Sequence, residues 1–266
     1  MVAGAGMLHA AARLLPRSVP LPALVGAGML AGLGFAWLGS AGAVLATPLL
    51  MLGVPARWVH RLMGLHLLLV VLGGLSGLVR RPRLALPWHL LRRFLLPALA
   101  ALAGAAWLGP RLGGRWLWGV LAAALVWQAV ALWRPGRPSR HPGLRAALVG
   151  GLMGLAGAGA GLFVPPALAA MGPELPVPVL ARGSLVITAL LAGGSAGAYV
   201  LHGWIRWRAA LWLLAASGVG SALGGRLEGR GRLRRLQEPA VYRRLVGWLC
   251  LAAGVMAALR GLGAWR

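Results

Sequence analysis

Two stretches of the chain carry the same pattern: Gly34-Phe-Ala-Trp-Leu-Gly-Ser-Ala-Gly-Ala-Val-Leu-Ala-Thr-Pro48 and Gly151-Leu-Met-Gly-Leu-Ala-Gly-Ala-Gly-Ala-Gly-Leu-Phe-Val-Pro165. Both are rich in small residues, lie inside long uncharged runs and end in proline. Glycine and proline weaken a helix, and a bilayer tolerates broken helices only where they are buried in protein or line a cavity. A helix break at matching positions of two halves indicates the binding site of a transporter.

The composition predicts an integral membrane protein. Of the 266 residues, 59% are hydrophobic and only 11% are charged, whereas a soluble domain carries about 25% charged residues. Eight runs are long enough to approach the roughly 17–25 residues of a spanning helix, and the first and fifth are longer than one crossing needs. The runs are 18–56, 62–79, 94–110, 116–133, 146–173, 183–205, 209–225 and 245–259. We therefore expect an all-α, polytopic fold with about eight transmembrane helices, in which the first helix of each half is broken by glycine and proline.

The net charge of +24 indicates contact with lipid rather than with nucleic acid. All 27 basic residues other than histidine are arginines, and they are spread through the loops between the apolar runs. Arginine loops of this kind anchor a membrane protein in anionic lipid. Many of the 13 tryptophans lie at the ends of the runs, as in the aromatic belt of a membrane protein.

Several residue types that specific chemistry requires are missing. The chain has no Asp, Asn or Lys, one cysteine (Cys250), and three acids, Glu174, Glu228 and Glu238, all in loops. A single cysteine forms neither an intrachain disulfide nor a metal cluster. We expect no metal, no cofactor and no enzymatic activity.

The duplication divides the chain into four parts. We expect an N-terminal arm at 1–20, a first transmembrane repeat at 21–133, a Pro- and Arg-rich linker at 134–143 and a second repeat at 144–266. If the long first run of each half enters the membrane and returns, the loops 80–93, 134–145, 172–182 and 225–244 share one face and carry 17 of the arginines. This arrangement also makes the two repeats inverted, and we favour it over two repeats that each cross four times.

The broken segments supply the first candidates for substrate binding. Closely spaced small residues let the backbone approach a substrate, and a helix that restarts after a break presents free N–H groups and its positive dipole end to an anion. The other interpretation is close helix packing through small residues. The candidates are Gly157, Gly159, Gly161 and Pro165, with Ser40, Gly42, Thr47 and Pro48 in the weaker first-half copy.

Polar side chains inside apolar runs supply the second group. Ser184, Thr188 and Ser195 have spacings that can share a helical face, where they could donate hydrogen bonds to an oxyanion or bond their own helix backbone. His66 is the only histidine well inside an apolar run, and an intramembrane ionisable group is a functional candidate. The other interpretation is a hydrogen-bonded core histidine, since no carboxylate accompanies it. Arg61 could attract anions or anchor the helix end.

These motifs resemble the sulfite exporter (TauE/SafE) family over residues 22 to 262. The similarity is strongest in the second half, at 157–165, Gly183-Ser-Leu185 and Gly225-Arg-Leu227. In the first half, Ser40 and Val44 stand where glycines are expected, and Leu65-His66 replaces a pair with a small hydroxyl residue. The resemblance implies a multi-pass permease of the bacterial inner membrane for sulfite, sulfonates or related organosulfur anions.

The membrane potential and the lack of acids indicate the direction of transport, and the sequence also leaves two other functions open. An inside-negative potential favours the exit of an anion by roughly 2.3 kcal/mol per charge per 100 mV, about fiftyfold, and the runs contain no acid that could couple uptake to a cation, so we expect export. One alternative is a membrane scaffold or assembly factor without transport. A second is a rhomboid-like serine protease, since Gly74-Leu-Ser-Gly77 resembles a nucleophile loop with His202 as its base. The sequence does not predict an oligomeric state.

Overall fold

The computed structural model describes residues 21–38, 42, 45–47, 50–51, 59–80, 88–133, 141–157, 160–171, 177–228 and 239–263. Within these ranges the chain forms helices and no strand, as predicted. The elements are α2 (Leu21–Leu38), α4 (Val59–Arg80), α5 (Trp88–Leu108), the short 3-10 helix η3 (Gly109–Arg111), α6 (Gly114–Trp133), α7 (Pro142–Ala156), α8 (Ala160–Met171), α9 (Val177–Leu201), α10 (Trp207–Glu228) and α11 (Pro239–Gly261).

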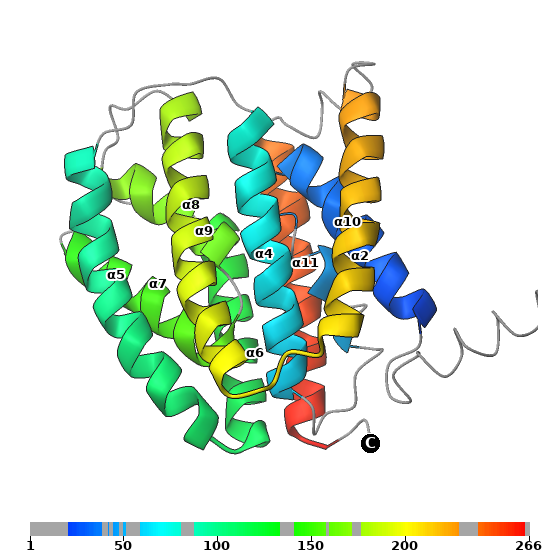
Figure 1. Cartoon of the computed structure of the whole chain (residues 1–266). Helices are drawn as coiled ribbons and strands as arrows, with labels where there is room; N and C mark the ends of the chain where they lie inside the picture. The colour runs from blue at the N-terminus through cyan, green and yellow to red at the C-terminus, as the bar shows by residue number, and fades with distance from the viewer. Residues whose placement is uncertain are drawn as a thin grey trace, which may run out of the picture.

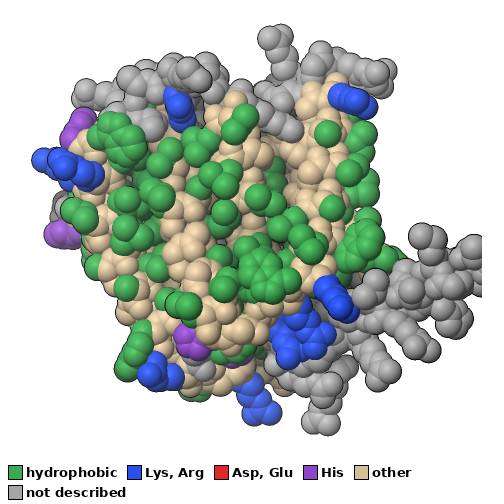
Figure 2. Space-filling view, viewed as in Figure 1, with side chains coloured by type: hydrophobic (Ala, Val, Ile, Leu, Met, Phe, Trp, Pro, Cys, Tyr) green, Lys and Arg blue, Asp and Glu red, His purple; other side chains and the backbone are tan. Residues whose placement is uncertain are grey.

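The fold is that of a polytopic membrane protein. Six of the described helices, α4, α5, α6, α9, α10 and α11, are long and apolar enough to cross a membrane, and α2 and α7 contain shorter apolar segments. Hydrophobic side chains cover the middle of the visible face, and arginines lie toward its upper and lower edges (Figure 2). Twenty-nine leucines, valines and tryptophans of the described residues are exposed, which suits contact with lipid tails. The predicted total of eight crossing helices stays a prediction.

The helices pack mainly in four pairs. Helices α4 and α9 stand side by side in the centre of the molecule, with α5 and α7 on one side and α2 and α10 on the other (Figure 1). Helices α6 and α11 form the fourth pair. Each pair joins one helix from the first half of the chain to one from the second, so neither half folds on itself.

The glycine contacts give the relative directions of the helices in three of these pairs. Helices α2 and α10 run parallel, α5 and α7 also run parallel, and α4 and α9 run antiparallel. The contacts that show this are Gly28 with Ala216, Gly224 with Ala36, Gly150 with Ala98, Gly154 with Ala105, Gly64 with Tyr199 and Gly77 with Leu185.

These directions place both ends of each broken run on one face. The lower face in Figure 1 holds the start of α4 and the end of α9. Helix α10 starts there, five residues after α9 ends, and its parallel neighbour α2 starts there too. The first run therefore leaves the lower face and is back at it when α4 begins at Val59.

The second broken run does the same from the upper face. Helix α4 ends at the upper face, and α5 starts at the same face (Figure 1). Because α7 runs parallel to α5, α7 also starts toward the upper face. Helix α8 ends at Met171, shortly before α9 begins at Val177 on that face. The α7–α8 segment therefore enters and returns, whereas a single helix over 146–173 would have emerged on the opposite side.

Candidate functional site

The break between α7 and α8 occurs at Gly157. Its φ of 57° and ψ of 12° are left-handed, and its N–H donates to the carbonyl of Met153 at 2.9 Å, which closes the C-terminus of α7. A Cβ at this position would lie 2.9 Å from Cβ of Met63 and 3.3 Å from Cδ1 of Leu67 on α4. Both the backbone conformation and the space thus require glycine, which is the reason that the helix ends here.

His66 on α4 binds the break directly. Its Nδ1 lies 3.2 Å from the carbonyl oxygen of Gly157, and its side chain is buried. A carbonyl only accepts, so Nδ1 carries the proton in this bond. Of the two interpretations of His66, the structure shows a buried hydrogen-bonded histidine whose partner is the helix break itself.

Ser195 connects α9 to the same place. Its Oγ donates a long hydrogen bond of 3.5 Å to the carbonyl of Met153, the residue that also accepts from the N–H of Gly157. The structure thus brings together the end of α7, His66 from α4 and Ser195 from α9. The side chains of Met153, His66 and Ser195 are all buried.

Ser184 and Thr188 lie elsewhere on α9. Both are buried, like Ser195, but Thr188 precedes Ser195 by seven residues, or about 10 Å along a helix. Ser184 follows Gly183, which lies near Leu168 of α8. The two hydroxyl side chains are therefore nearer to the end of α8 and the upper face than to the break.

The first-half copy of the motif is described only in part. Gly42 is buried against the backbone of Gly34 and Phe35, so a Cβ there would collide with it. Residues 34 and 42 are therefore in direct contact. Thr47 is also buried.

Several predicted residues cannot be placed. Ser40, Pro48 and Gly159 lie outside the described residues, and of Gly161 only the helical backbone of α8 is described. Pro165 is half-buried within α8.

Among the described residues, the site contains no ionisable side chain other than His66. Helix α8 restarts at Ala160, so its positive dipole end and the free N–H groups of its first turn lie at the break. The one described acid, Glu228, is at the end of α10 on the upper face, and no group of three potential metal ligands occurs in the described part of the chain. The positive end of α8 would favour an anion at the break.

Two features with polar side chains were not predicted. Gln128 on α6 is buried, and it is the only glutamine inside an apolar run, which the sequence alone could have revealed. The second is a cluster of aromatic and histidine side chains around Trp204. Its members come from two distant sequence regions, around residue 60 and at 199–204, so no local pattern identified it.

The rhomboid-like alternative fails on geometry. The hydroxyl of Ser76 donates to the carbonyl of Gly73 in its own helix at 3.1 Å. Ser76 precedes Gly77, which faces Leu185 near the upper face, whereas His202 follows the end of α9 at the lower face. Ser76 and His202 therefore do not form a nucleophile and its base.

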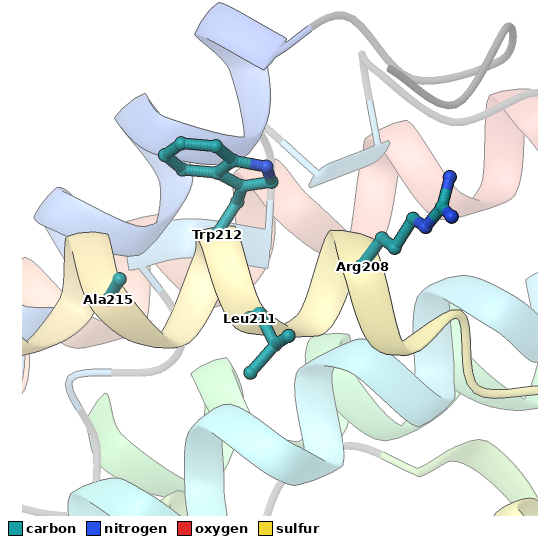
Figure 3. A pocket seen from close by; sticks show the side chains of 4 residues that line it. All are labelled: Arg208, Leu211, Trp212 and Ala215. Atoms are coloured by element: carbon teal, nitrogen blue, oxygen red, sulfur yellow. The ribbon is translucent and has the colours of Figure 1, made fainter. Parts of the chain in front are cut away.

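A surface groove on α10 is separate from the break. It encloses about 370 Å³ and is lined by Arg208, Leu211, Trp212 and Ala215, all from one helix (Figure 3). All four side chains are exposed. The groove shares no residue with the site at Gly157, and we assign it to contact with lipid.

Comparison with known proteins agrees with this architecture. A profile described as sulfite exporter TauE/SafE matches residues 24–257, nearly the whole chain. The chain belongs to the sulfite exporter TauE/SafE family. The comparisons with curated proteins and with solved structures each gave no match. Membership of the TauE/SafE family makes the chain a multi-pass membrane transporter for sulfur-containing anions.

Proposed function

We propose that this protein is a permease that exports sulfite, a sulfonate or a related organosulfur anion across the bacterial inner membrane. The observation that carries the proposal is the break at Gly157, which is held by His66 inside the protein. A helix break buried among crossing helices exposes backbone donors where a substrate can reach them. The family supplies the class of anion, and the electrostatics of the site support it.

The substrate path runs beside the two broken segments. We propose that Gly157, Gly159, Gly161 and Pro165 line it in the second half, with Ser40, Gly42, Thr47 and Pro48 in the first. His66 holds the α7–α8 break in place, and Ser184 and Thr188 offer hydroxyl donors farther along α9. An anion would pass from the hydroxyl groups of α9 to the N-terminus of α8, with neutral donors replacing its water shell.

The two halves are inverted repeats. If α2 of the first half is equivalent to α7 of the second, and α5 is equivalent to α10, then the pair α2–α10 corresponds to the pair α7–α5. Both pairs are parallel. The first run enters from the lower face and the second from the upper face. Two broken segments that enter from opposite sides can each open the path to one side, as alternating access requires.

The charge distribution supports export. The segments 80–93, 134–145, 172–182 and 225–244 contain 17 of the arginines, and the described helix ends that flank them lie on the upper face. By the positive-inside rule this face is then cytoplasmic. The membrane potential then drives anions from the upper to the lower face. No described acid lies within the membrane-spanning part to couple uptake to protons or cations.

Transport by the purified protein separates this proposal from a scaffold. Labelled sulfite is loaded into proteoliposomes, and its efflux is followed with and without a competing sulfonate outside. Saturable efflux that exceeds that of protein-free liposomes supports the permease. A correctly folded protein that moves no sulfite, sulfonate or thiosulfate would instead favour the scaffold.

A further inference from the structure

The contact between α4 and α9 at the lower face is built around Trp204, which is not part of the site at Gly157. Trp204 lies in the connection from α9 to α10, and this connection crosses the lower end of α4 (Figure 1). The ring of His60, at the start of α4, stacks on the indole, with ring centroids 4.2 Å apart and an interplanar angle of 26°. Tyr199 of α9 meets the indole edge-on at 5.3 Å. We call His60, Tyr199 and Trp204 the Trp204 latch.

The α9 side of the latch is held by the backbone. Gly203 has a φ of 67°, and its N–H donates to the carbonyl of Val200 at 2.9 Å. The N–H of Trp204 donates to the carbonyl of Tyr199 at 3.1 Å, which completes a Schellman motif at the end of α9. The edge-on contact of Trp204 with Tyr199 is the apolar contact that accompanies this motif. Trp204 would therefore move together with α9.

The α4 side of the latch is held by weaker contacts. Tyr199 Oη donates to Sδ of Met63 at 3.5 Å, and a thioether is a weak acceptor. Gly64 contributes no side chain where it faces Tyr199 and Ile205. In the described part of the chain, Nδ1 of His60 is shielded from solvent and makes no hydrogen bond. The Tyr199 hydroxyl and the His60 imidazole would gain hydrogen bonds to water if α4 moved away from the end of α9, so this interface is the one that can open.

The latch lies between the helix break and the lower face. On α4, Met63 is the residue against which Gly157 packs, and His60 is almost one helical turn nearer the lower face. On α9, Ser195 bonds the end of α7, and Tyr199 follows it by one turn, or about 6 Å along the helix. An anion that leaves the break between these two helices toward the lower face therefore meets the latch.

We infer that the Trp204 latch is the gate of the path at the lower face, closed in this structure, and that separation of α4 from the end of α9 opens it. The inference rests on the proposed function and deepens it, since it names the contact that must open for an anion to leave. The hydrogen bond from Tyr199 to Met63 connects the gate to the break, because Met63 packs against Gly157. Movement of α4 away from Tyr199 would thus also loosen the support of the break.

Accessibility of the break tests the gate without any transport. Ser195→Cys places a thiol beside the break, in a Cys250→Ala background that lacks the native cysteine. Its reaction with an impermeant thiol reagent is followed in intact cells and in everted vesicles, with equal amounts of folded protein. The lower face is identified as the side from which Gly113→Cys, before α6, reacts.

Opening of the latch should expose this thiol from one side only. We expect Trp204→Ala and His60→Ala each to speed its reaction from the lower face about tenfold, since loss of the aromatic contact raises the open population. Trp207→Ala is the matched control, because Trp207 is exposed, lies three residues farther along and is not part of the latch. An unchanged rate in both latch variants, an equal rise in Trp207→Ala or an equal rise from the opposite face would overturn the gate, whether or not sulfite is transported.

A disulfide across the latch tests the same opening by flux. A Cβ at Gly64 would lie 3.7 Å from Cβ of Tyr199, within the range of disulfide bonds. We expect oxidised Gly64→Cys/Tyr199→Cys, in the Cys250→Ala background, to lose at least about tenfold in sulfite flux and to regain it on reduction. Gly254→Cys/Leu125→Cys is the control that should keep its flux when oxidised, because it joins α11 to α6, with Cβ atoms 3.3 Å apart.

The gate and the proposed function fail separately. Equal flux of the oxidised and reduced latch pair, in a protein that transports sulfite, would overturn the gate and leave the proposed function intact. Absence of flux in wild type would count against the proposed function alone. Where wild type or the reduced pair moves no sulfite, the labelling of Ser195→Cys decides whether the latch is a gate.

Discussion

Gly157 meets two separate requirements. Its left-handed φ costs another residue about 1–2 kcal/mol, and a Cβ would press on Met63. We therefore expect Gly157→Ala to lower the free energy of unfolding by at least about 1–2 kcal/mol, measured by thermal or denaturant unfolding in detergent. Gly151→Ala is the control in the same helix, since a Cβ there has nothing within 4 Å and alanine favours a helix. Equal stabilities of the two variants would show that the break does not depend on Gly157.

His66 is expected to stabilise the break through one hydrogen bond. His66→Leu leaves the buried carbonyl of Gly157 without this donor, which costs about 1–3 kcal/mol. His66→Asn retains an N–H group at a similar distance from the backbone, so most of the stability and the sulfite flux should return. Thermal unfolding and flux of both variants measure this. If Leu and Asn behave alike, the bond to Gly157 is not what His66 contributes.

At the scale of helices, small residues allow the parallel pairs to approach closely. A Cβ on Gly220 of α10 would collide with the backbone of Met29 on α2, and a Cβ on Gly150 of α7 would collide with that of Ala98 on α5. Gly28 with Gly32, Gly220 with Gly224 and Gly150 with Gly154 are each spaced by four, the spacing of small-residue helix interfaces in membranes. Glycine therefore serves packing in these pairs and ends a helix at Gly157.

We expect Gly220→Ala and Gly150→Ala to destabilise the protein, because α2 and α5 must move away by the width of a methyl group. Gly218→Ala and Gly151→Ala are the matched controls on the same helices, since a Cβ there meets nothing within 4 Å. Midpoints of thermal unfolding should fall for the first two only. A similar fall at both positions would agree with equivalent roles of the two pairs, and no fall at either would contradict the close packing.

The sequence predicts the elements better than their contacts. Uncharged length identified the six long helices, and the repeated glycines identified the break at Gly157. The expectation that the terminal proline also breaks the helix was wrong, since Pro165 lies inside the continuous helix α8. It could not predict that His66 bonds Gly157 or that His60 stacks on Trp204, because both contacts join residues far apart in the chain. Spacing on one helix grouped Ser184 and Thr188 with Ser195, but it could not predict that Ser195 bonds the carbonyl of Met153 on α7, since the register between helices depends on packing.

At the scale of the molecule, the inverted arrangement predicts which side each connection faces. Cys250 is buried, so a cysteine introduced at an open position is the main target of an impermeant thiol reagent. Gly143 at the start of α7 and Gly113 before α6 each have open surroundings. We expect Gly143→Cys to react from the cytoplasm, in everted vesicles, and Gly113→Cys to react from outside, in intact cells. Reaction of both from the same side would contradict the arrangement.

The central claim is that sulfur anions cross the membrane beside the break at Gly157. Its most direct test is sulfite flux in proteoliposomes at two imposed membrane potentials, with wild type, Gly157→Ala and Gly151→Ala reconstituted to equal amounts of folded protein. The account predicts flux that rises with the outward driving force by up to about fiftyfold per charge per 100 mV, is retained in Gly151→Ala and falls at least about tenfold in Gly157→Ala. Full flux in folded Gly157→Ala would place the path elsewhere, and flux independent of the potential would contradict export driven by charge.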